Sequence, residues 1–170
     1  MQLDKSIVLI GMMGSGKSTI GYLLSKKLGF KFIDIDHVIE NETNEKIANI
    51  FKLKGEEYFR KIEEKITMKV LKSQNSVIAL GGGGFLNANI RKETLSKCIT
   101  IWLNWNNLTI LKRIAKSKKR PIAFGSSNSE IIQMISYRSK VYALSKYKIN
   151  CEKLSKNMIV KKILKIYERL

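Results

Sequence analysis

The chain has 170 residues, of which 44% are hydrophobic and 27% are charged, a balance typical of a globular protein with one core. No apolar run approaches the roughly 20 residues of a membrane helix, and the start of the chain lacks a secretory pattern, so the sequence predicts a cytoplasmic protein without a membrane span. Cys98 and Cys151 lie far apart, which excludes a disulfide scaffold and a zinc ribbon and fits a reducing compartment.

The formal net charge of +18 has two interpretations. It could indicate a partner rich in phosphate, either a nucleotide or a nucleic acid. It could also reflect a coding bias toward lysine, isoleucine and asparagine, and we favour this reading for most of the excess. Arginine is scarce in such a chain, so each arginine is a candidate for a position that needs a planar fork to bind carboxylate or phosphate. For any single arginine the alternative is an ordinary surface ion pair, which for Arg60 would form with Glu56 or Glu64 at helical spacing.

Strands and helices are expected to alternate along the chain. The predicted strands are 6–11, 30–36, 76–80, 97–103 and 146–150. The predicted helices are 17–28, 47–51, 56–73 and 155–170. This alternation is typical of an α/β fold in which a five-stranded parallel sheet carries helices on both faces, here within a single domain, 1–170. Ligands of such folds bind at the carboxyl ends of the strands, so unusual residues that follow a strand are candidates for function.

The first such motif is GMMGSGKST, residues 11–19, which fits the phosphate-binding pattern G-x-x-x-x-G-K-[ST]. A predicted strand precedes it and a predicted helix follows it, as this loop requires. The glycines let the backbone wrap around a polyphosphate, and the helix N-terminus adds partial positive charge. Lys17 is expected to reach the β- and γ-phosphates of a nucleotide, and the Ser18 hydroxyl to ligate Mg²⁺.

The second motif is Asp34-Ile35-Asp36 at the end of a predicted strand. Alternation along a strand puts both carboxylates on one face, where one could lie near the metal and the other near an acceptor hydroxyl. The alternative is that Asp36 is simply the N-cap of a following helix. Next to a phosphate-binding loop, we favour the functional interpretation.

Two further segments carry weaker signals. Four consecutive glycines, 81–84, follow a predicted strand and would let the backbone approach a ligand closely, although a flexible turn has the same composition. The basic segment 112–120, followed by Pro121, could be part of a mobile lid over approximately 112–125, or only a solvated charged loop.

Taken in order, these motifs resemble the shikimate kinase family, whose enzymes have a fold of the nucleoside-monophosphate-kinase type with a phosphate-binding loop, or P-loop. The stretches that carry the resemblance are GMMGSGKST, FIDIDHVIE, IANIF with GEEYFRKIEE, ALGGGG, KRPIA, and RSKVY beginning at Arg138. They span nearly the whole chain, and their order is more specific than the P-loop alone. The chain departs from the family pattern at Lys140, where a proline is common, at Lys146, where an alanine is common, and at Ile122, where a leucine is common.

The resemblance implies a role for individual residues. The ATP-binding residues would be Gly14, Ser15, Gly16, Lys17, Ser18, Thr19, Arg113 and Arg120. The shikimate-binding residues would be Asp36, Arg60, Gly82 and Arg138, within acceptor-binding helices at approximately 36–73. The catalytic residues would be Lys17, Asp36 and Arg120, and Mg²⁺ would bind Ser18 directly and Asp34 through water. Phe51 and Phe59 would form apolar walls of the acceptor pocket, and Glu63 would hold Arg60 in place.

The activity implied by the resemblance is ATP-dependent phosphorylation of the 3-hydroxyl of shikimate, a step of the chorismate and aromatic amino acid pathway. The expected enzyme is a monomer that binds neither nucleic acid nor membrane. One alternative is another small-molecule kinase of the same fold, such as a gluconate-type kinase, which would share the P-loop but not the arginine pair Arg60 and Arg138. The other alternative is an inactive basic relative that binds nucleic acid, which the lack of aromatic residues among the basic ones disfavours.

Overall fold

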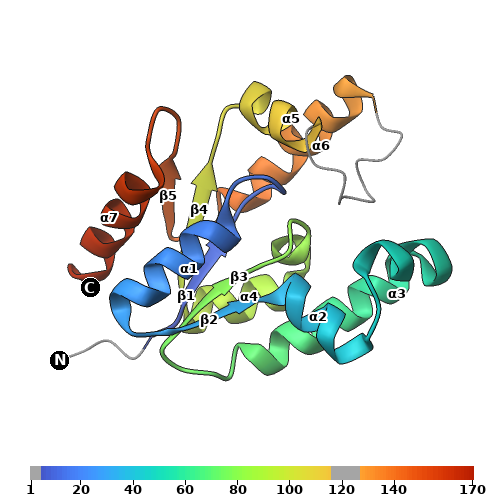
Figure 1. Ribbon diagram of the computed structural model, residues 1–170, viewed down its shortest axis with the longest axis horizontal. Coiled ribbons are helices and arrows are strands. Elements are labelled where there is room, and N and C mark those ends of the chain that lie inside the picture. The colour runs from blue at the N-terminus through green and yellow to red at the C-terminus, as the bar shows by residue number, and fades with distance from the viewer. Residues whose placement is uncertain (1–4, 116–126) are drawn as a thin grey trace.

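A five-stranded parallel sheet forms the centre of the computed structural model, which describes residues 5–115 and 127–170 (Figure 1). Its strands lie in the order β2-β3-β1-β4-β5, and neighbouring strands pair in parallel. The strands are β1 (Ile7–Ile10), β2 (Lys31–Asp34), β3 (Ser76–Ala79), β4 (Ile99–Asn104) and β5 (Tyr147–Asn150). The α/β class and the five parallel strands predicted from the sequence are therefore confirmed.

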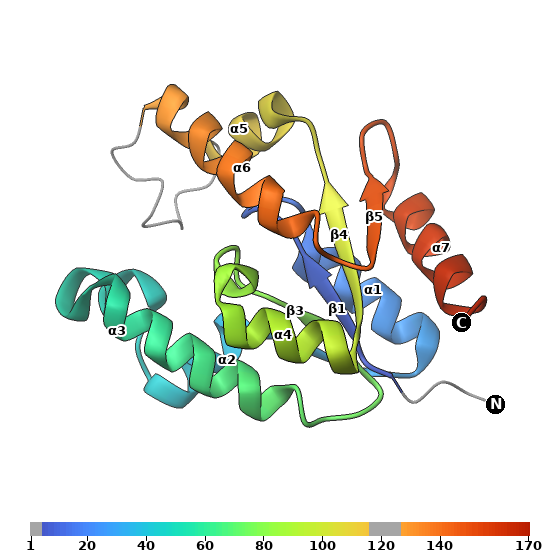
Figure 2. The ribbon, with the colours of Figure 1, turned by 180° about the vertical axis from the view of Figure 1, so that it is seen from behind.

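Helices cover both faces of this sheet, as predicted. The helices are α1 (Lys17–Leu28), α2 (Ile35–Thr43), α3 (Ile47–Val70), α4 (Ala88–Lys97), α5 (Asn107–Ala115), α6 (Asn128–Tyr142) and α7 (Lys156–Tyr167), with a short 3₁₀ turn at Gly84–Leu86. Helices α1 and α7 lie on one face, and α4 and α6 lie on the other, as the two opposite views show (Figures 1 and 2). None of the helices in the described ranges has the length and hydrophobicity that a membrane span requires.

The alternation of side chains along β1 explains why both faces are covered. Ile7 and Leu9 point into a core that includes residues of α1 and α7, whereas Val8 and Ile10 point into the core on the other face. All four side chains are buried. A strand that is apolar on both faces must be covered on both faces, because each exposed apolar side chain would forfeit about 1.5–3 kcal/mol of burial.

Two regions near the site are organised differently from the predicted elements. The strand predicted over 30–36 ends at Asp34, because Ile35 already begins α2. The helices predicted separately at 47–51 and 56–73 form α3, which is kinked at Gly55, where φ is 82°. A residue with a side chain is strained at such a φ, so glycine permits the kink. Both boundaries affect the site, because Asp34, Asp36 and the start of α3 lie beside it.

Candidate active site

The loop that follows β1 carries the phosphate-binding motif and leads into α1. Gly14 and Gly16 have φ of 77° and 89°, in the left-handed region that glycine adopts without strain. Gly16 is the N-cap of α1, with no side-chain hydrogen bond at that end, and the first turn of the helix contains no acidic residue. The Lys17 ammonium lies across the loop and donates to the carbonyl oxygens of Gly11 and Met12 at 2.8 and 2.9 Å. The loop therefore gathers backbone N–H groups, a helix N-terminus and a buried cation, a combination suited to a polyphosphate.

Asp34 and Ser18 bring two oxygen ligands together at the mouth of this loop. The Ser18 hydroxyl donates to Asp34 Oδ2 at 2.5 Å, while Asp34 Oδ1 accepts from the backbone N–H of Asp36 at 3.1 Å. Asp34 is therefore the N-cap of α2, and the alternative that made Asp36 the cap is wrong. Asp36 lies in the first turn of α2. The relative positions of the Asp34 and Asp36 carboxylates are therefore set by the start of the helix and not by alternation along a strand.

The same pair of side chains fits a magnesium ion. Hydroxyl and carboxylate oxygens are the ligands that Mg²⁺ prefers, and Mg²⁺ usually keeps several waters and binds phosphate oxygens in addition to one or two carboxylates. Within the described ranges, no group of three or more His, Cys, Asp or Glu side chains gathers as a metal site. The donor set beside the P-loop therefore suits a metal that a nucleotide would bring with it, and not an ion caged by protein alone.

The glycine turn, residues 81–84, lies where charged side chains from several elements meet. A Cβ atom on Gly81 would lie 2.5 Å from Glu63 Oε1 and 2.8 Å from Asp36 Oδ1. A Cβ on Gly82 would lie 3.3 Å from the backbone N of Met13 and 3.5 Å from Arg138 Nη1. The glycines are thus required by close approach: side chains from α2, α3 and α6 pack against a bare backbone that also touches the P-loop.

Arg60 is held on this turn by two carboxylates of its own helix. Its Nη1 bonds to Glu63 at 2.6 Å and its Nη2 bonds to Glu56 at 2.9 Å. The alternative of an ordinary ion pair is realised with Glu56. Glu64 instead accepts hydrogen bonds from the side-chain amides of Asn87 and Asn89. The Glu63 pair is a different kind of contact, because Glu63 is only 2% exposed.

Burial governs the electrostatics of the Arg60 and Glu63 pair. Burial raises the pKa of Glu63 above its usual range, although Arg60 pulls in the opposite direction. Burial also opposes the charge of Arg60, but Glu63 and Glu56 together raise the pKa of its guanidinium. Glu63 Oε1 is buried without a hydrogen-bond partner among the described residues, so the carboxylate has one oxygen on Arg60 and one facing the glycine turn.

Arg138 comes to the same place from α6, and it is buried. The residue is 6% exposed, and its Nη1 atom has no hydrogen-bond partner in the part of the chain that the structure describes. Burying a guanidinium nitrogen without a hydrogen-bond partner costs folding free energy, so the buried Nη1 favours an anionic ligand at this position. Tyr142, one turn further along α6, donates its hydroxyl to the carbonyl oxygen of Gly82. Burial raises the pKa of Tyr142 to about 12, so the phenol stays a neutral donor.

Two aromatic side chains of α3, Phe51 and Phe59, lie close to each other near Arg60. The rings of Phe51 and Phe59 lie 4.6 Å apart between centroids, and Phe59 is buried. The Arg60 guanidinium lies 5.2 Å from the Phe59 centroid, within the range of a cation–π contact. The Phe59 ring therefore supports the Arg60 guanidinium from its own helix.

Arg113 and Trp105 lie on the outer side of the P-loop. Arg113 Nη1 donates to the carbonyl oxygen of Gly14 at 3.2 Å, and its guanidinium carbon is 3.7 Å from the centre of the Trp105 ring. Trp105 Nε1 donates in turn to the carbonyl oxygen of Ser15 at 2.9 Å. Arg113 is therefore beside the P-loop, as expected, while Trp105 carried no signal in the sequence. Arg120 and Pro121 lie outside the described residues.

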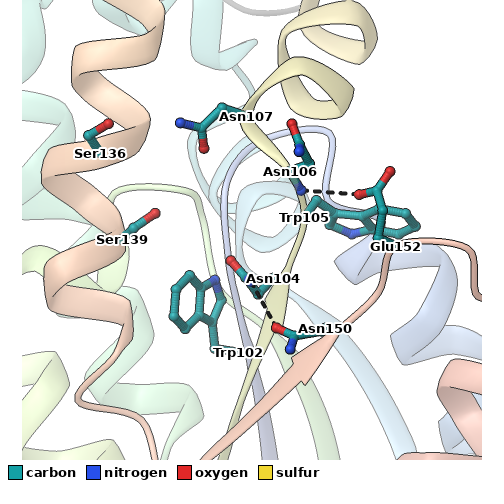
Figure 3. Close-up of a pocket in the computed structure, with 9 residues that line it drawn as sticks. All are labelled: Trp102, Asn104, Trp105, Asn106, Asn107, Ser136, Ser139, Asn150 and Glu152. Carbon is teal, nitrogen blue, oxygen red and sulfur yellow. Dashed lines mark hydrogen bonds between the residues drawn. The ribbon is translucent and has the colours of Figure 1, made fainter.

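A cleft of about 610 Å³ opens at the carboxyl ends of β4 and β5, between these strands and α6 (Figure 3). Asparagine side chains dominate its polar lining, and Asn104 Nδ2 donates to Asn150 Oδ1 across the two strands at 3.0 Å. Two of its lining residues, Trp105 and Glu152, also belong to the surroundings of Arg113. The cleft thus adjoins the P-loop on the side away from the glycine turn.

Replacing Gly83 by alanine should weaken binding of an acidic acceptor without unfolding the protein. The added methyl group would meet the Arg60 guanidinium, which can move away because it is the end of a flexible side chain. Moving it forfeits a charge-assisted contact, so we expect acceptor affinity to fall on the order of tenfold. The matched variant is Gly84→Ala, whose methyl group would make ordinary contacts of 3.5 Å and beyond and should have a smaller effect. Calorimetric titration of both variants tests this, and equal affinities would contradict the close approach.

Comparisons with known proteins agree with the geometry. The family model for shikimate kinase matches residues 13–168. A shikimate kinase from Persephonella marina is 41% identical over 161 residues, covering 94% of this chain and 97% of its own. A solved shikimate kinase from Acinetobacter baumannii, in complex with shikimate, superposes with a TM-score of 0.93 at 28% identity, covering 99% and 95% of the two chains. The solved enzyme from Aquifex aeolicus superposes with a TM-score of 0.87 at 35% identity, covering 96% of each chain. On sequence and fold alike, the chain belongs to the shikimate kinase family and is an ATP-dependent kinase.

Proposed function

We propose that this chain transfers the γ-phosphoryl group of ATP to the 3-hydroxyl of shikimate, and that the residues brought together at the glycine turn select the acceptor. The observation that carries the proposal is the convergence of Asp36, Arg60 and Arg138 on a turn whose backbone touches the P-loop. A carboxylate and two guanidinium groups beside a loop suited to polyphosphate support this proposal. A hydroxy acid is the kind of acceptor that fits it.

On the nucleotide side, the P-loop residues Gly14 to Thr19 bind phosphate through backbone N–H groups and through Lys17. Lys17 is buried and already points into the loop, so its charge needs little rearrangement to act on phosphate oxygens. A preorganised cation of this kind stabilises the charge that spreads over the transferring group. Ser18 and Asp34 would hold Mg²⁺, which when bound supplies further neutralisation of the β- and γ-phosphate oxygens.

On the acceptor side, Arg138 and Arg60 bind the carboxylate and Asp36 orients the hydroxyl. Arg138 supports this role with its buried Nη1, which has no hydrogen-bond partner among residues 5–115 and 127–170. Asp36 supports it with a half-buried carboxylate that faces the glycine turn. Asp36 accepts the hydroxyl proton or the hydrogen bond from it, which raises the electron density on the attacking oxygen.

The remaining parts of the proposal rest on the sequence. By resemblance to the family, Arg120 contacts the transferring phosphate from a lid at approximately 112–125, and the acceptor-binding helices span approximately 36–73. We also propose that the enzyme acts as a monomer in the cytoplasm and binds neither nucleic acid nor membrane. Both cysteines are buried and free, which fits a reducing compartment. A steep salt dependence in nucleic-acid binding would argue against this part.

An assay of ADP release tests the acceptor directly. We expect turnover to require shikimate, with gluconate and nucleoside monophosphates giving no more than the rate without acceptor. A gluconate-type kinase of the same fold would show the opposite preference. If shikimate does not raise the rate above background, the assignment of the acceptor is wrong.

A further inference from the structure

Trp105 is the first residue after β4, and it contacts both the P-loop and the arginine on the nucleotide side. It is half-buried, and Figure 3 shows its ring on the side of the strand that faces Glu152. Its two contacts are of different kinds: a hydrogen bond from Nε1 to the Ser15 carbonyl and a stacking contact with Arg113. The ring also packs, as a partly buried neighbour, against the core clusters on both faces of the sheet.

The hydrogen bond fixes the direction of a phosphate-binding amide. In a planar trans peptide the C=O and N–H groups point in opposite directions. The Ser15 carbonyl accepts from the Trp105 ring nitrogen, so the N–H of Gly16, in the same peptide group, points away from the indole. Gly16 has a left-handed backbone conformation, and glycine can adopt many others. The hydrogen bond from Trp105 therefore stabilises one orientation of this peptide group.

The stacking contact fixes the plane of Arg113. The guanidinium lies 3.7 Å from the ring centre and also donates to the Gly14 carbonyl. Arg113 is half-buried, so part of the group remains open to solvent. Nearby, Glu152 accepts from the backbone N–H of Asn106 at 3.1 Å and from the Thr109 hydroxyl at 2.8 Å, which ties the loop after β5 to the start of α5. The guanidinium is thus oriented by the indole at the edge of this loop.

We propose that Trp105 is a positioning residue for the nucleotide: it orients the Gly16 N–H for phosphate and holds Arg113 flat as a platform for the nucleotide base. This rests on the proposed use of ATP, and it adds a residue that acts through two others. A planar guanidinium stacks on aromatic rings from either face, so an indole below it leaves the upper face for a purine. Trp105 then links the phosphate end and the base end of the same ligand.

Tryptophan fluorescence offers a readout that does not depend on turnover. The chain contains two tryptophans, and the other one, Trp102, is buried against Tyr142 with its ring centroid 6.0 Å away. In a Trp102→Phe variant, emission comes from Trp105 alone, and we expect it to change when ADP or ATP with Mg²⁺ is added. In a Trp105→Phe variant, emission comes from Trp102, and we expect little response to nucleotide. A silent Trp105 would overturn the proposal.

Two substitutions separate the two contacts. Trp105→Phe keeps a ring under Arg113 but removes the Nε1 donor, and it should weaken ADP binding on the order of fivefold. Trp105→Leu removes both, and it should weaken binding on the order of thirtyfold. Calorimetric titration with ADP in the absence of acceptor measures both, and thermal unfolding shows whether each variant folds. If Trp105→Leu fails to fold, the Phe variant and the fluorescence experiment still decide.

The outcomes also distinguish this inference from the proposed function. Shikimate affinity should stay within about twofold in Trp105→Phe, because the polar contacts of the ring are with Ser15 and Arg113 on the nucleotide side. ADP affinity within about twofold of the parent in both variants would overturn the inference, even if the enzyme phosphorylates shikimate normally. Conversely, a Trp105-dependent loss of ADP binding in a protein that does not turn over shikimate would leave the inference standing and overturn the acceptor assignment.

Discussion

Replacing Lys17 by alanine is expected to reduce turnover on the order of a thousandfold, or about 4 kcal/mol in the activation barrier. The ammonium group is buried in the P-loop and carries the charge that a transferring phosphoryl group requires. No other cation of the described loop, residues 11–19, could replace it. Steady-state rates with saturating shikimate and ATP measure the loss.

The fold should survive this change, although at reduced stability. Lys17 donates to the carbonyls of Gly11 and Met12, and leaving these carbonyls without a donor costs about 1–3 kcal/mol. Circular dichroism and thermal unfolding should therefore show a cooperative but earlier transition. Lys27→Ala removes an exposed lysine from the end of the same helix and should leave the rate unchanged. Complete unfolding of the Lys17 variant would mean that its role is structural.

Replacing Arg138 by lysine is expected to weaken binding of shikimate by thirtyfold or more while ATP affinity changes little. Lysine keeps the charge and loses the fork that binds both oxygens of a carboxylate. Removing one partner of a desolvated charge pair costs roughly 2–5 kcal/mol, in contrast to about 0.3–0.5 kcal/mol for an exposed helical pair. Because the Nη1 nitrogen of Arg138 is buried, we expect the larger cost, that of a desolvated charge pair. Arg60→Lys should behave in the same way, with the Glu63 contact weakened as well.

Equilibrium titrations with shikimate and with ATP measure the two affinities separately. Arg169→Lys makes the same chemical change at an exposed position near the end of the chain and should alter neither affinity. Acceptor affinity that changes less than about threefold in both Arg60→Lys and Arg138→Lys, which is well under 1 kcal/mol, would show that these arginines do not bind the acceptor carboxylate. A non-acidic acceptor would then become the better hypothesis.

The parts of the fold that could be predicted from the sequence are those with strong local signals. The P-loop joins a glycine pattern to a buried strand and a helix, so its position and its surroundings followed directly. Helices α4, α5 and α6 were not assigned. In α4 the only buried residues are Ile90 and Thr94, so the sequence lacks the repeated apolar positions that indicate an amphipathic helix. The start of α6 did carry a signal, because Ser127 and Glu130 form a capping box.

The site was only partly predictable for a related reason. Arg60 and Arg138 stood out because arginine is scarce, but 78 positions separate them in the chain and no local pattern shows that they meet at one turn. Tyr142 and Trp105 act through backbone carbonyls of Gly82 and Ser15. Contacts with backbone carbonyls leave no residue pairing in the sequence, so these two side chains became visible only in three dimensions. The identity of the Asp34 cap was missed because it depended on where β2 ends.

Asp34 narrows the range of residues that evolution could accept at its position. One oxygen closes the first turn of α2, and the other meets the Ser18 hydroxyl at the P-loop. Asparagine could replace it as a cap but carries no charge, whereas glutamate keeps the charge but is too long for a good cap. Serine or threonine at this position would cap the helix, but the Ser18 hydroxyl would then lose its carboxylate neighbour. A residue that caps α2 and, as proposed, also helps to bind magnesium can therefore be replaced by few others, and it couples the start of α2 to the phosphate-binding loop.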